Sequence, residues 1–202
     1  MLLEVHEHHP EPRKIRRAVD ALERGEVIAY PTDSGYGLGC DVTNKKAIER
    51  LYAIKKLEKT RPVAFLCPDL ADIAKYAMVE NQVYRVLRRF LPGPYCFILP
   101  ASKDVPKMLQ SKQKTIGIRV PKHEITQALV RELGRPLVST TASLDHGDPL
   151  IDPDEIDDAF KGLGLVLDGG VGGLLPSTVI DLTKMPPEVV REGAGSIEEF
   201  VA

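Results

Sequence analysis

Residues 27–39 read VIAYPTDSGYGLG, and this stretch guides the interpretation of the whole chain. Its first four residues are apolar, which predicts a short buried strand. Residues 31–39 combine glycines with the hydroxyls of Thr32, Ser34 and Tyr36, as in a loop where the backbone comes close to a small polar or phosphorylated ligand. An ordinary turn with glycines at positive φ explains the same residues, so this stretch alone leaves both interpretations open.

Helices and strands are predicted to alternate around this stretch. Apolar residues at helical spacing, with glycines as stop signals, predict helices at residues 11–23, 45–56, 70–77, 81–90 and 124–132 and a short one after Asp152. Short apolar runs predict strands at residues 63–67, 96–99, 115–120 and 137–141, and near Val166, Val179 and Val189. Uneven spacing and proline-rich turns argue against a regular doubly wound parallel sheet. We therefore expect an α/β (α+β) fold with a twisted mixed sheet and flanking helices.

Length and composition predict one domain. With 202 residues, of which 43% are hydrophobic, the chain can bury one sizeable core, so we expect a single domain over residues 1–202. Within it, residues 1–10 are expected to form a flexible or edge segment. The net charge is only −2, which excludes the binding of polyanions by bulk charge, so any anion site must be local.

The cysteines and the N-terminal segment indicate a cytoplasmic protein. Cys40, Cys67 and Cys96 lie far apart without a CxxC pair, which favours free thiols in a reducing compartment over disulfides or a zinc site. The N-terminus lacks a basic region followed by an apolar stretch, and no apolar run reaches the roughly 18 residues that a membrane span needs. We expect a cytoplasmic localisation and no membrane partner.

Basic residues cluster at one predicted helix-to-strand junction and recur inside one predicted strand. Lys55, Lys56, Lys59 and Arg61 lie at the junction. Such groups bind phosphate oxygens, but cations also complement the dipole of a helix C-terminus without any ligand. Arg119 stands in an apolar strand pattern, where it must either face outward or be paired at a site. The sequence therefore leaves two interpretations open for the junction and for Arg119, one in which they bind a ligand and one in which they are structural.

Hydroxyl and guanidinium groups also occur at the ends of other predicted strands. Ser139, Thr141 and Ser143 lie at the end of one strand, whereas Ser177 and Arg191 flank the last two. Each group can contact a phosphate or a ribose, or it can cap the next segment. If these strands lie in one sheet, their polar ends converge on one site.

Several familiar sites lack support in the sequence. The chain contains no GxxxxGK[ST] loop, no GxGxxG that opens a helix and no HExxH. His6, His8 and His9 could chelate a metal, but histidines in a leading segment are more often solvated, so we predict no metal site. His123 and His146 leave a Ser-His-Asp triad open, although no GxSxG elbow supports one.

Six motifs, taken in order, resemble the YrdC/YciO family. They lie at residues 31–39, 91–94, 117–121, 139–143, 177–181 and 191–194. They span almost the whole chain, and the ordered set is far more specific than any one motif. The resemblance implies a YrdC-like fold whose concave basic cleft binds nucleotides or double-stranded RNA.

The best-understood members of this family are threonylcarbamoyl-AMP synthases, which join L-threonine, bicarbonate and ATP and release pyrophosphate on the way to a modified tRNA. The resemblance implies that Thr32, Ser34 and Tyr36 face the threonine. It assigns the following residues to the nucleotide or RNA: Lys55, Lys59, Arg61, Arg119, Ser139, Thr141, Ser143, Ser177 and Arg191. It implies no tightly bound cofactor, with ATP and Mg²⁺ as a substrate if the protein is an enzyme.

Two positions depart from the synthase pattern. The pattern Lys-x-Arg maps onto Lys55 and Leu57, which replaces the arginine, whereas a shifted register on residues 59–61 restores it. The pattern Ser-x-Asn maps onto Thr141 and Ser143, which loses the amide. Each loss costs a few kcal/mol of transition-state stabilisation. We therefore predict a YciO-like protein linked to tRNA modification that binds ATP or AMP and double-stranded RNA or tRNA, as a monomer or homodimer, with an active synthase as the alternative.

Overall fold

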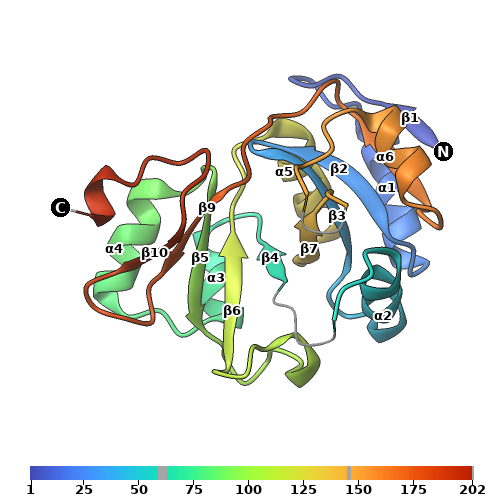
Figure 1. Ribbon diagram of the computed structural model, residues 1–202. Coiled ribbons are helices and arrows are strands. Elements are labelled where there is room, and N and C mark those ends of the chain that lie inside the picture. Colours follow the sequence, from blue (N-terminus) through green and yellow to red (C-terminus); the bar gives the residue numbers. More distant parts are fainter. Residues whose placement is uncertain (59–62, 145–146, 202) are drawn as a thin grey trace.

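The computed structural model describes residues 1–58, 63–144 and 147–201 (Figure 1). In this part of the chain, one sheet holds ten strands in the order β1-β8-β2-β3-β7-β4-β6-β5-β9-β10. The strands are β1 (Leu2–Glu4), β2 (Ile28–Thr32), β3 (Gly35–Asp41), β4 (Ala64–Leu66), β5 (Tyr95–Pro100), β6 (Thr115–Arg119), β7 (Leu137–Thr141), β8 (Leu165–Asp168), β9 (Thr178–Asp181) and β10 (Glu188–Arg191). The N-terminus and the C-terminus lie at opposite ends of this sheet (Figure 1).

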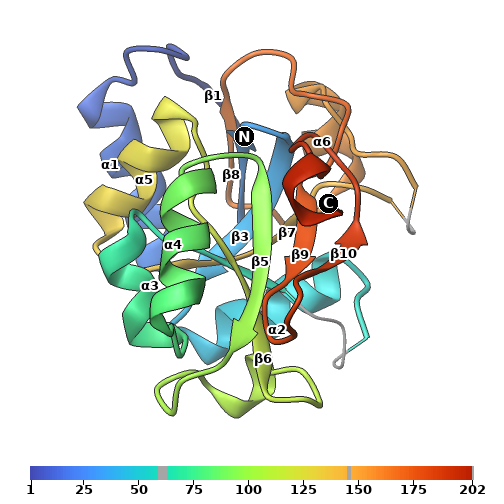
Figure 2. The same ribbon diagram turned by 90° about the vertical axis from the view of Figure 1, so that its left-hand side faces the viewer.

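The helices of the described residues flank the sheet. They are α1 (Pro12–Glu23), α2 (Lys45–Ile54), α3 (Leu70–Tyr76), α4 (Asn81–Phe90), α5 (Glu124–Leu133) and α6 (Pro153–Ala159), with the 3-10 helices η1 (Lys107–Leu109) and η2 (Glu198–Phe200). Asn44 caps α2 by accepting a hydrogen bond from the Ala47 N–H, and Gly134 ends α5 with φ at 70°. Figure 2 shows α1 packed beside α5. Among the helices described, none has the length and apolarity needed to cross a membrane.

Strands of the sheet pair in both directions. The pairs β1–β8, β2–β8, β4–β6 and β5–β9 are parallel, whereas β2–β3, β3–β7, β4–β7, β5–β6 and β9–β10 are antiparallel. This arrangement confirms the predicted mixed sheet with flanking helices. It also brings β4, β5, β6, β7, β9 and β10, which carry most of the polar strand ends, into one contiguous part of the sheet.

Residues 31–39 form part of a β-hairpin, so the loop predicted from their glycines is wrong. β2 pairs with β3 in antiparallel register, and every residue of both strands is buried. The glycines make room for a tyrosine: a Cβ on Gly39 would lie 2.6 Å from the Tyr30 hydroxyl oxygen, and one on Gly37 would lie 3.1 Å from the Tyr30 ring. The glycine pattern therefore reflects close packing inside a sheet.

Two hydrophobic clusters cover opposite faces of β2. Ile28 and Tyr30 belong to the smaller cluster, which includes residues of α1 and α5. Ala29 belongs to the larger cluster, which includes residues of α2, α3, α4 and α6. Since successive residues of a strand point to opposite faces, the alternation along β2 places one cluster on each side of the sheet.

The first residues of the chain add an edge strand and a turn. β1 pairs in parallel with β8 at the edge of the sheet. Next to it, His6 Nδ1 accepts hydrogen bonds from the backbone N–H groups of His8 at 3.3 Å and His9 at 3.1 Å. The His6 ring is thereby used inside the turn. Over the ranges the structure describes, no group of three or more His, Cys, Asp or Glu residues is placed to hold a metal ion.

Candidate ligand-binding site

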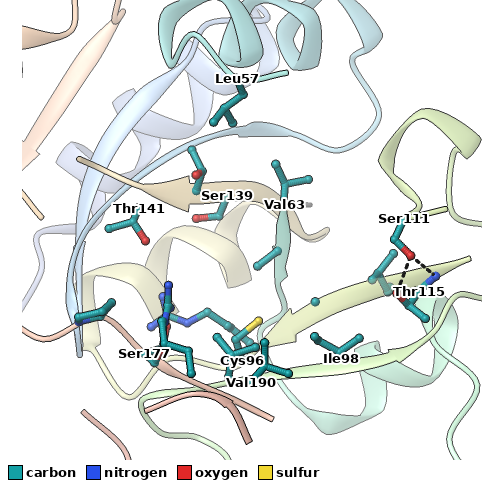
Figure 3. Close-up of a pocket in the computed structure, with 18 of the residues that line it drawn as sticks. Leu57, Val63, Cys96, Ile98, Ser111, Thr115, Ser139, Thr141, Ser177 and Val190 are labelled. Carbon is teal, nitrogen blue, oxygen red and sulfur yellow. Dashed lines mark hydrogen bonds between the residues drawn. The ribbon is translucent and has the colours of Figure 1, made fainter. Parts of the chain in front are cut away.

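A cavity of about 680 Å³ opens over the middle strands of the sheet. Residues of β4, β5, β6, β7, β9 and β10 and the end of α2 line it, and Figure 3 shows side chains from these elements around one space. Ligand pockets typically measure about 300 to 1,000 Å³, so this cavity has the size of a small-molecule site.

The floor of the cavity is a row of small residues across the sheet. In the strand register Ser139 lies opposite Ala64, and Ala64 lies opposite Gly117. Cys96 reaches over this row, because a Cβ on Gly117 would lie 2.9 Å from its Sγ atom. A row of larger side chains would fill the same space, so the small residues leave room for the cavity.

Arg119 is the most deeply buried cation of the cavity lining. It lies at the end of β6 and is 9% exposed. Its Nη2 donates to Asp33 Oδ1 and to Ser34 Oγ, each at 2.9 Å. Its Nε is buried and has no hydrogen-bond partner among the described residues. Of the two sequence interpretations, the paired one is confirmed, and a charged donor remains for a further acceptor.

Asp33 positions Arg119, and no sequence pattern singled it out. Its side chain is 10% exposed and lies at the turn between β2 and β3. Besides Arg119, it accepts a hydrogen bond from the Lys122 backbone N–H at 2.7 Å. An aspartate between threonine and serine looks like an ordinary turn residue, so the only sequence signal was the need of Arg119 for a buried counter-charge.

Lys55 connects the end of α2 to the segment after β7. Its Nζ donates to Ser143 Oγ at 3.0 Å and lies 5.5 Å from the centre of the Phe160 ring. Leu57 also lines the cavity, where the synthase pattern has an arginine. The two departures from that pattern, Leu57 and Ser143, therefore both face the same cavity.

Ser177, Arg191 and Thr141 line another part of the cavity. Arg191 donates from Nε at 3.2 Å and from Nη2 at 2.8 Å to the Ser177 carbonyl oxygen, which joins β10 to the start of β9. The Thr141 and Ser177 hydroxyls make no hydrogen bond to the residues that the structure describes, whereas the Ser139 hydroxyl accepts from Tyr30 at 2.6 Å. The hydroxyls of Thr141 and Ser177 thus have unused hydrogen-bonding capacity.

The three hairpin residues assigned to the threonine side do not line this cavity. Thr32 Oγ1 donates to the Gly35 carbonyl oxygen at 2.6 Å, and Ser34 Oγ accepts from Arg119. Tyr36 Oη donates to the Gly170 carbonyl oxygen at 2.8 Å, and burial raises the pKa of Tyr36 to about 12. Their hydroxyls serve the protein's own structure.

The other residues predicted for the site either line the cavity or lie outside the part of the chain that the structure describes. Lys55, Arg119, Ser139, Thr141, Ser143, Ser177 and Arg191 line the cavity. Lys59 and Arg61 lie outside the described residues. The predicted convergence of strand ends on one cavity therefore holds for six residues, and Lys55 joins them from the end of α2.

Cations dominate the charged groups of the cavity. Among the described lining residues, the cations are Lys55, Lys56, Arg119, Lys184 and Arg191, and the acid is Asp181. The local charge is therefore positive although the whole chain carries a net charge of −2. Burial raises the pKa of the Cys96 thiol, which Arg119 and Arg191 only partly offset, so the thiol is neutral and is a poor nucleophile.

Fold and cavity together define a class: an α/β protein with one mixed sheet and a cation-lined cavity over its middle strands. Residues 20–193 match the sequence model of the Sua5, YciO and YrdC family, which carries the description Telomere recombination. The chain belongs to this family, in agreement with the resemblance carried by its six motifs.

Individual relatives show which members of the family this chain resembles. The chain is 43% identical to the uncharacterized protein YciO of Escherichia coli K12 over 98% of its length and 97% of that protein. The crystal structure of E. coli YciO matches with a TM-score of 0.95 at 42% identity over 99% of this chain and 98% of that one. A threonylcarbamoyl-AMP synthase of Serratia proteamaculans is 33% identical over 87% of this chain and 94% of its own.

A further structural match is to a protein that was crystallised with an amino acid. P. abyssi Sua5 complexed with L-threonine matches with a TM-score of 0.92 at 29% identity, over 98% of this chain and 59% of that one. The protein is thus a YrdC-like domain related to threonylcarbamoyl-AMP synthases.

Proposed function

We propose that the cavity binds a nucleotide, with its phosphates between Arg119, Arg191 and Lys55. The observation that carries this proposal is the buried Arg119 Nε–H, which has no partner among the described residues. A buried donor without an acceptor costs about 1 to 3 kcal/mol, and an anionic oxygen removes that cost. ATP and AMP supply such oxygens, with Mg²⁺ accompanying ATP as part of the substrate.

Burial also decides which phosphates reach Arg119. Backbone phosphates of an RNA duplex lie on the outside of a wide helix and stay at the mouth of a cavity, whereas the phosphates of a free nucleotide enter it. Double-stranded RNA or tRNA therefore belongs at the rim, where Lys56 is exposed and the Lys184 side chain is 59% exposed. Binding there depends on phosphate contacts and falls with salt.

Calorimetry with ATP, Mg²⁺ and a short RNA duplex tests this proposal. We expect ATP to bind both alone and with the duplex present, and Arg191→Gln to weaken ATP binding about tenfold or more. Arg88→Gln, an exposed arginine of α4, is the matched control and should change nothing. Absence of ATP binding, or complete displacement of ATP by the duplex, would contradict the proposal.

The second candidate is an active threonylcarbamoyl-AMP synthase, which the similarity to a synthase favours. In that reaction the amine of threonine attacks bicarbonate and a water molecule leaves, which gives a carbamate. A carbamate oxygen then attacks the α-phosphorus, and the bond from that phosphorus to pyrophosphate breaks. Arg119, Arg191 and Lys55 would stabilise the charge on the phosphoryl group and on the leaving pyrophosphate. No protein nucleophile is needed.

Pyrophosphate release separates the two candidates. For the first, we expect slow release by the wild-type protein and an increase of about 100-fold in Leu57→Arg/Ser143→Asn, which restores both synthase groups. Leu57→Met/Ser143→Ala is the matched control because it adds neither charge nor amide. Rapid release by the wild-type protein that requires both threonine and bicarbonate would establish the second candidate instead.

A further inference from the structure

Tyr30 contacts the floor of the cavity from outside the cavity. It lies in β2, is fully buried, and is not among the residues that line the cavity. Its Oη donates a hydrogen bond of 2.6 Å to Ser139 Oγ, and Ser139 belongs to the row of small residues that forms the floor. Figure 3 shows Ser139 among the side chains around the cavity. Tyr30 therefore reaches the cavity through one hydroxyl, that of Ser139.

The strand between these two residues is shaped to let them meet. β3 lies between β2 and β7, and it places Gly37 opposite Tyr30 and Gly39 opposite Ser139. Directly opposite residues share one face of a sheet, so the Tyr30 ring crosses β3 over these two glycines. A Cβ on Gly39 would lie 2.6 Å from the Tyr30 hydroxyl oxygen and 2.9 Å from the Val138 carbonyl oxygen. A side chain at residue 39 would therefore displace the hydroxyl that contacts Ser139.

The hydrogen bond between the two hydroxyls has a fixed direction. Burial raises the pKa of Tyr30, and the bond to Ser139 and the charge of Arg119 offset this only in part, so the phenol keeps its proton well above neutral pH. Because Tyr30 supplies the hydrogen between the two oxygens, the hydrogen of the Ser139 hydroxyl points away from Tyr30. No described residue accepts it. Ser139 thus offers a donor at the cavity floor.

Ser139 differs in this respect from two other hydroxyls of the lining. Thr141 and Ser177 make no hydrogen bond to the described residues, so no described residue orients their hydrogens. Accepting a hydrogen bond from Tyr30 restricts the rotation of the Ser139 hydroxyl and polarises it. A donor that is already oriented before a ligand arrives loses less rotational freedom on binding.

We propose that Tyr30 is a positioning residue, which holds the Ser139 hydroxyl as a hydrogen-bond donor to the ligand and does not itself touch the ligand. The inference rests on the proposed function, because the acceptor is an oxygen or nitrogen atom of the nucleotide bound in the cavity. Tyr30 lies just outside the motif at residues 31–39, and it is 109 residues away from Ser139 in the chain. The contact between the two strands is what assigns this role.

A double-mutant cycle on Tyr30 and Ser139 tests the inference, with ATP affinity measured by calorimetry. Ser139→Ala removes the donor and should weaken ATP binding about fivefold, whereas Tyr30→Phe removes only its orientation and should weaken binding about threefold. In Tyr30→Phe/Ser139→Ala, the affinity should equal that of Ser139→Ala, because Tyr30 acts through Ser139 alone. A general structural role of Tyr30 would instead lower the affinity by the same factor with and without Ser139.

Urea unfolding and a matched control accompany the cycle. Ser139→Ala leaves the Tyr30 hydroxyl buried without its acceptor and should lower the urea midpoint, which the addition of Tyr30→Phe should partly restore. Tyr95→Phe is the matched control, because it removes another tyrosine hydroxyl, which donates to the Ser196 carbonyl oxygen at 3.0 Å, from a buried residue that does not line the cavity. This control should lower the urea midpoint and leave ATP affinity unchanged.

Each contrary result has a distinct meaning. If ATP does not bind to the wild-type protein, the proposed function and this inference both fail. If ATP binds equally well to the wild type and to Tyr30→Phe, the proposed function stands and the positioning role is wrong. An equal loss from Tyr30→Phe with and without Ser139, or a comparable loss in Tyr95→Phe, would also overturn the positioning role.

Discussion

The β2–β3 hairpin and the cavity wall carry the same kind of side chain but use it differently. In the hairpin, the hydroxyls of Thr32, Ser34 and Tyr36 are all hydrogen-bonded within the protein. In the cavity, the hydroxyls of Thr141 and Ser177 make no hydrogen bond to the described residues. The difference shows that hydroxyl content alone does not mark a binding site. The cavity differs from the hairpin by its unused hydrogen-bonding capacity.

Arg119 joins these two regions, and its loss should have the largest effect. Arg119→Met removes the cation and leaves the Asp33 carboxylate buried beside Ser34 without its counter-charge. Breaking a buried ion pair in this way costs about 3 to 5 kcal/mol. We expect the urea midpoint of unfolding to fall accordingly, and nucleotide binding to be lost even in the folded fraction.

A double variant separates the ion pair from the packing. Asp33→Asn/Arg119→Met removes both charges and should regain most of the lost stability while still failing to bind nucleotide. If the double variant is as unstable as Arg119→Met, the loss comes from packing and not from the unpaired carboxylate.

The next effect contrasts one threonine of each region. Thr32→Val removes a buried hydroxyl that donates to the Gly35 carbonyl oxygen and accepts from the Ser34 N–H at 3.2 Å, so the free energy of unfolding should fall by about 1 to 3 kcal/mol. Thr141→Val removes a hydroxyl without a protein partner among the described residues and should change it by less than about 0.5 kcal/mol. Urea unfolding of both variants measures the contrast, and equal losses would refute it.

Tyr36 gives the hairpin a dependence on alkaline pH. Tyr36→Phe loses the hydrogen bonds to Gly170 and from the Gly169 N–H, at a cost of about 1 kcal/mol near neutral pH. The folded pKa of Tyr36 is raised to about 12 by burial, so its contribution is complete below the ordinary value of 10 and is lost as pH rises toward 12. The stability difference between wild type and variant should therefore shrink above pH 10. A constant difference from pH 8 to pH 11 would contradict this assignment.

Periodic elements could be predicted from the sequence because each is specified locally. The predicted helix at residues 81–90 and the predicted strand at residues 137–141 coincide with α4 and β7. Apolar spacing, caps and glycine stops lie within these segments and need no tertiary information. The loop predicted at residues 31–39 was wrong because its glycines are explained by a contact outside their own segment. The glycines of β3 make room for Tyr30 on the neighbouring strand.

The sequence predicted many of the residues that line the cavity, but it did not predict their contacts with one another. The sequence indicated Arg119, Ser139 and Thr141 as candidates, because these polar residues interrupt apolar runs at the ends of predicted strands. Asp33 was missed because its importance depends on a partner 86 residues away. Which hydroxyls are used internally also depends on contacts between distant segments, so no local pattern distinguishes Thr32 from Thr141.

The smallest expected effect tests the cavity side of the comparison directly. Thr141→Val and Ser177→Ala each remove one hydroxyl that is available to a ligand, so ATP affinity should fall about threefold to tenfold for each, which is the range of a single net hydrogen bond. Calorimetry at constant salt measures this change, and the urea midpoints of both variants should match the wild type.

Ser139→Ala is the informative counterpart, because its hydroxyl already accepts from Tyr30 and its loss should lower stability more than affinity. If Thr141→Val and Ser177→Ala leave ATP affinity unchanged, then unused hydroxyls on the cavity wall do not identify ligand contacts, and the contrast with the hairpin would concern stability alone.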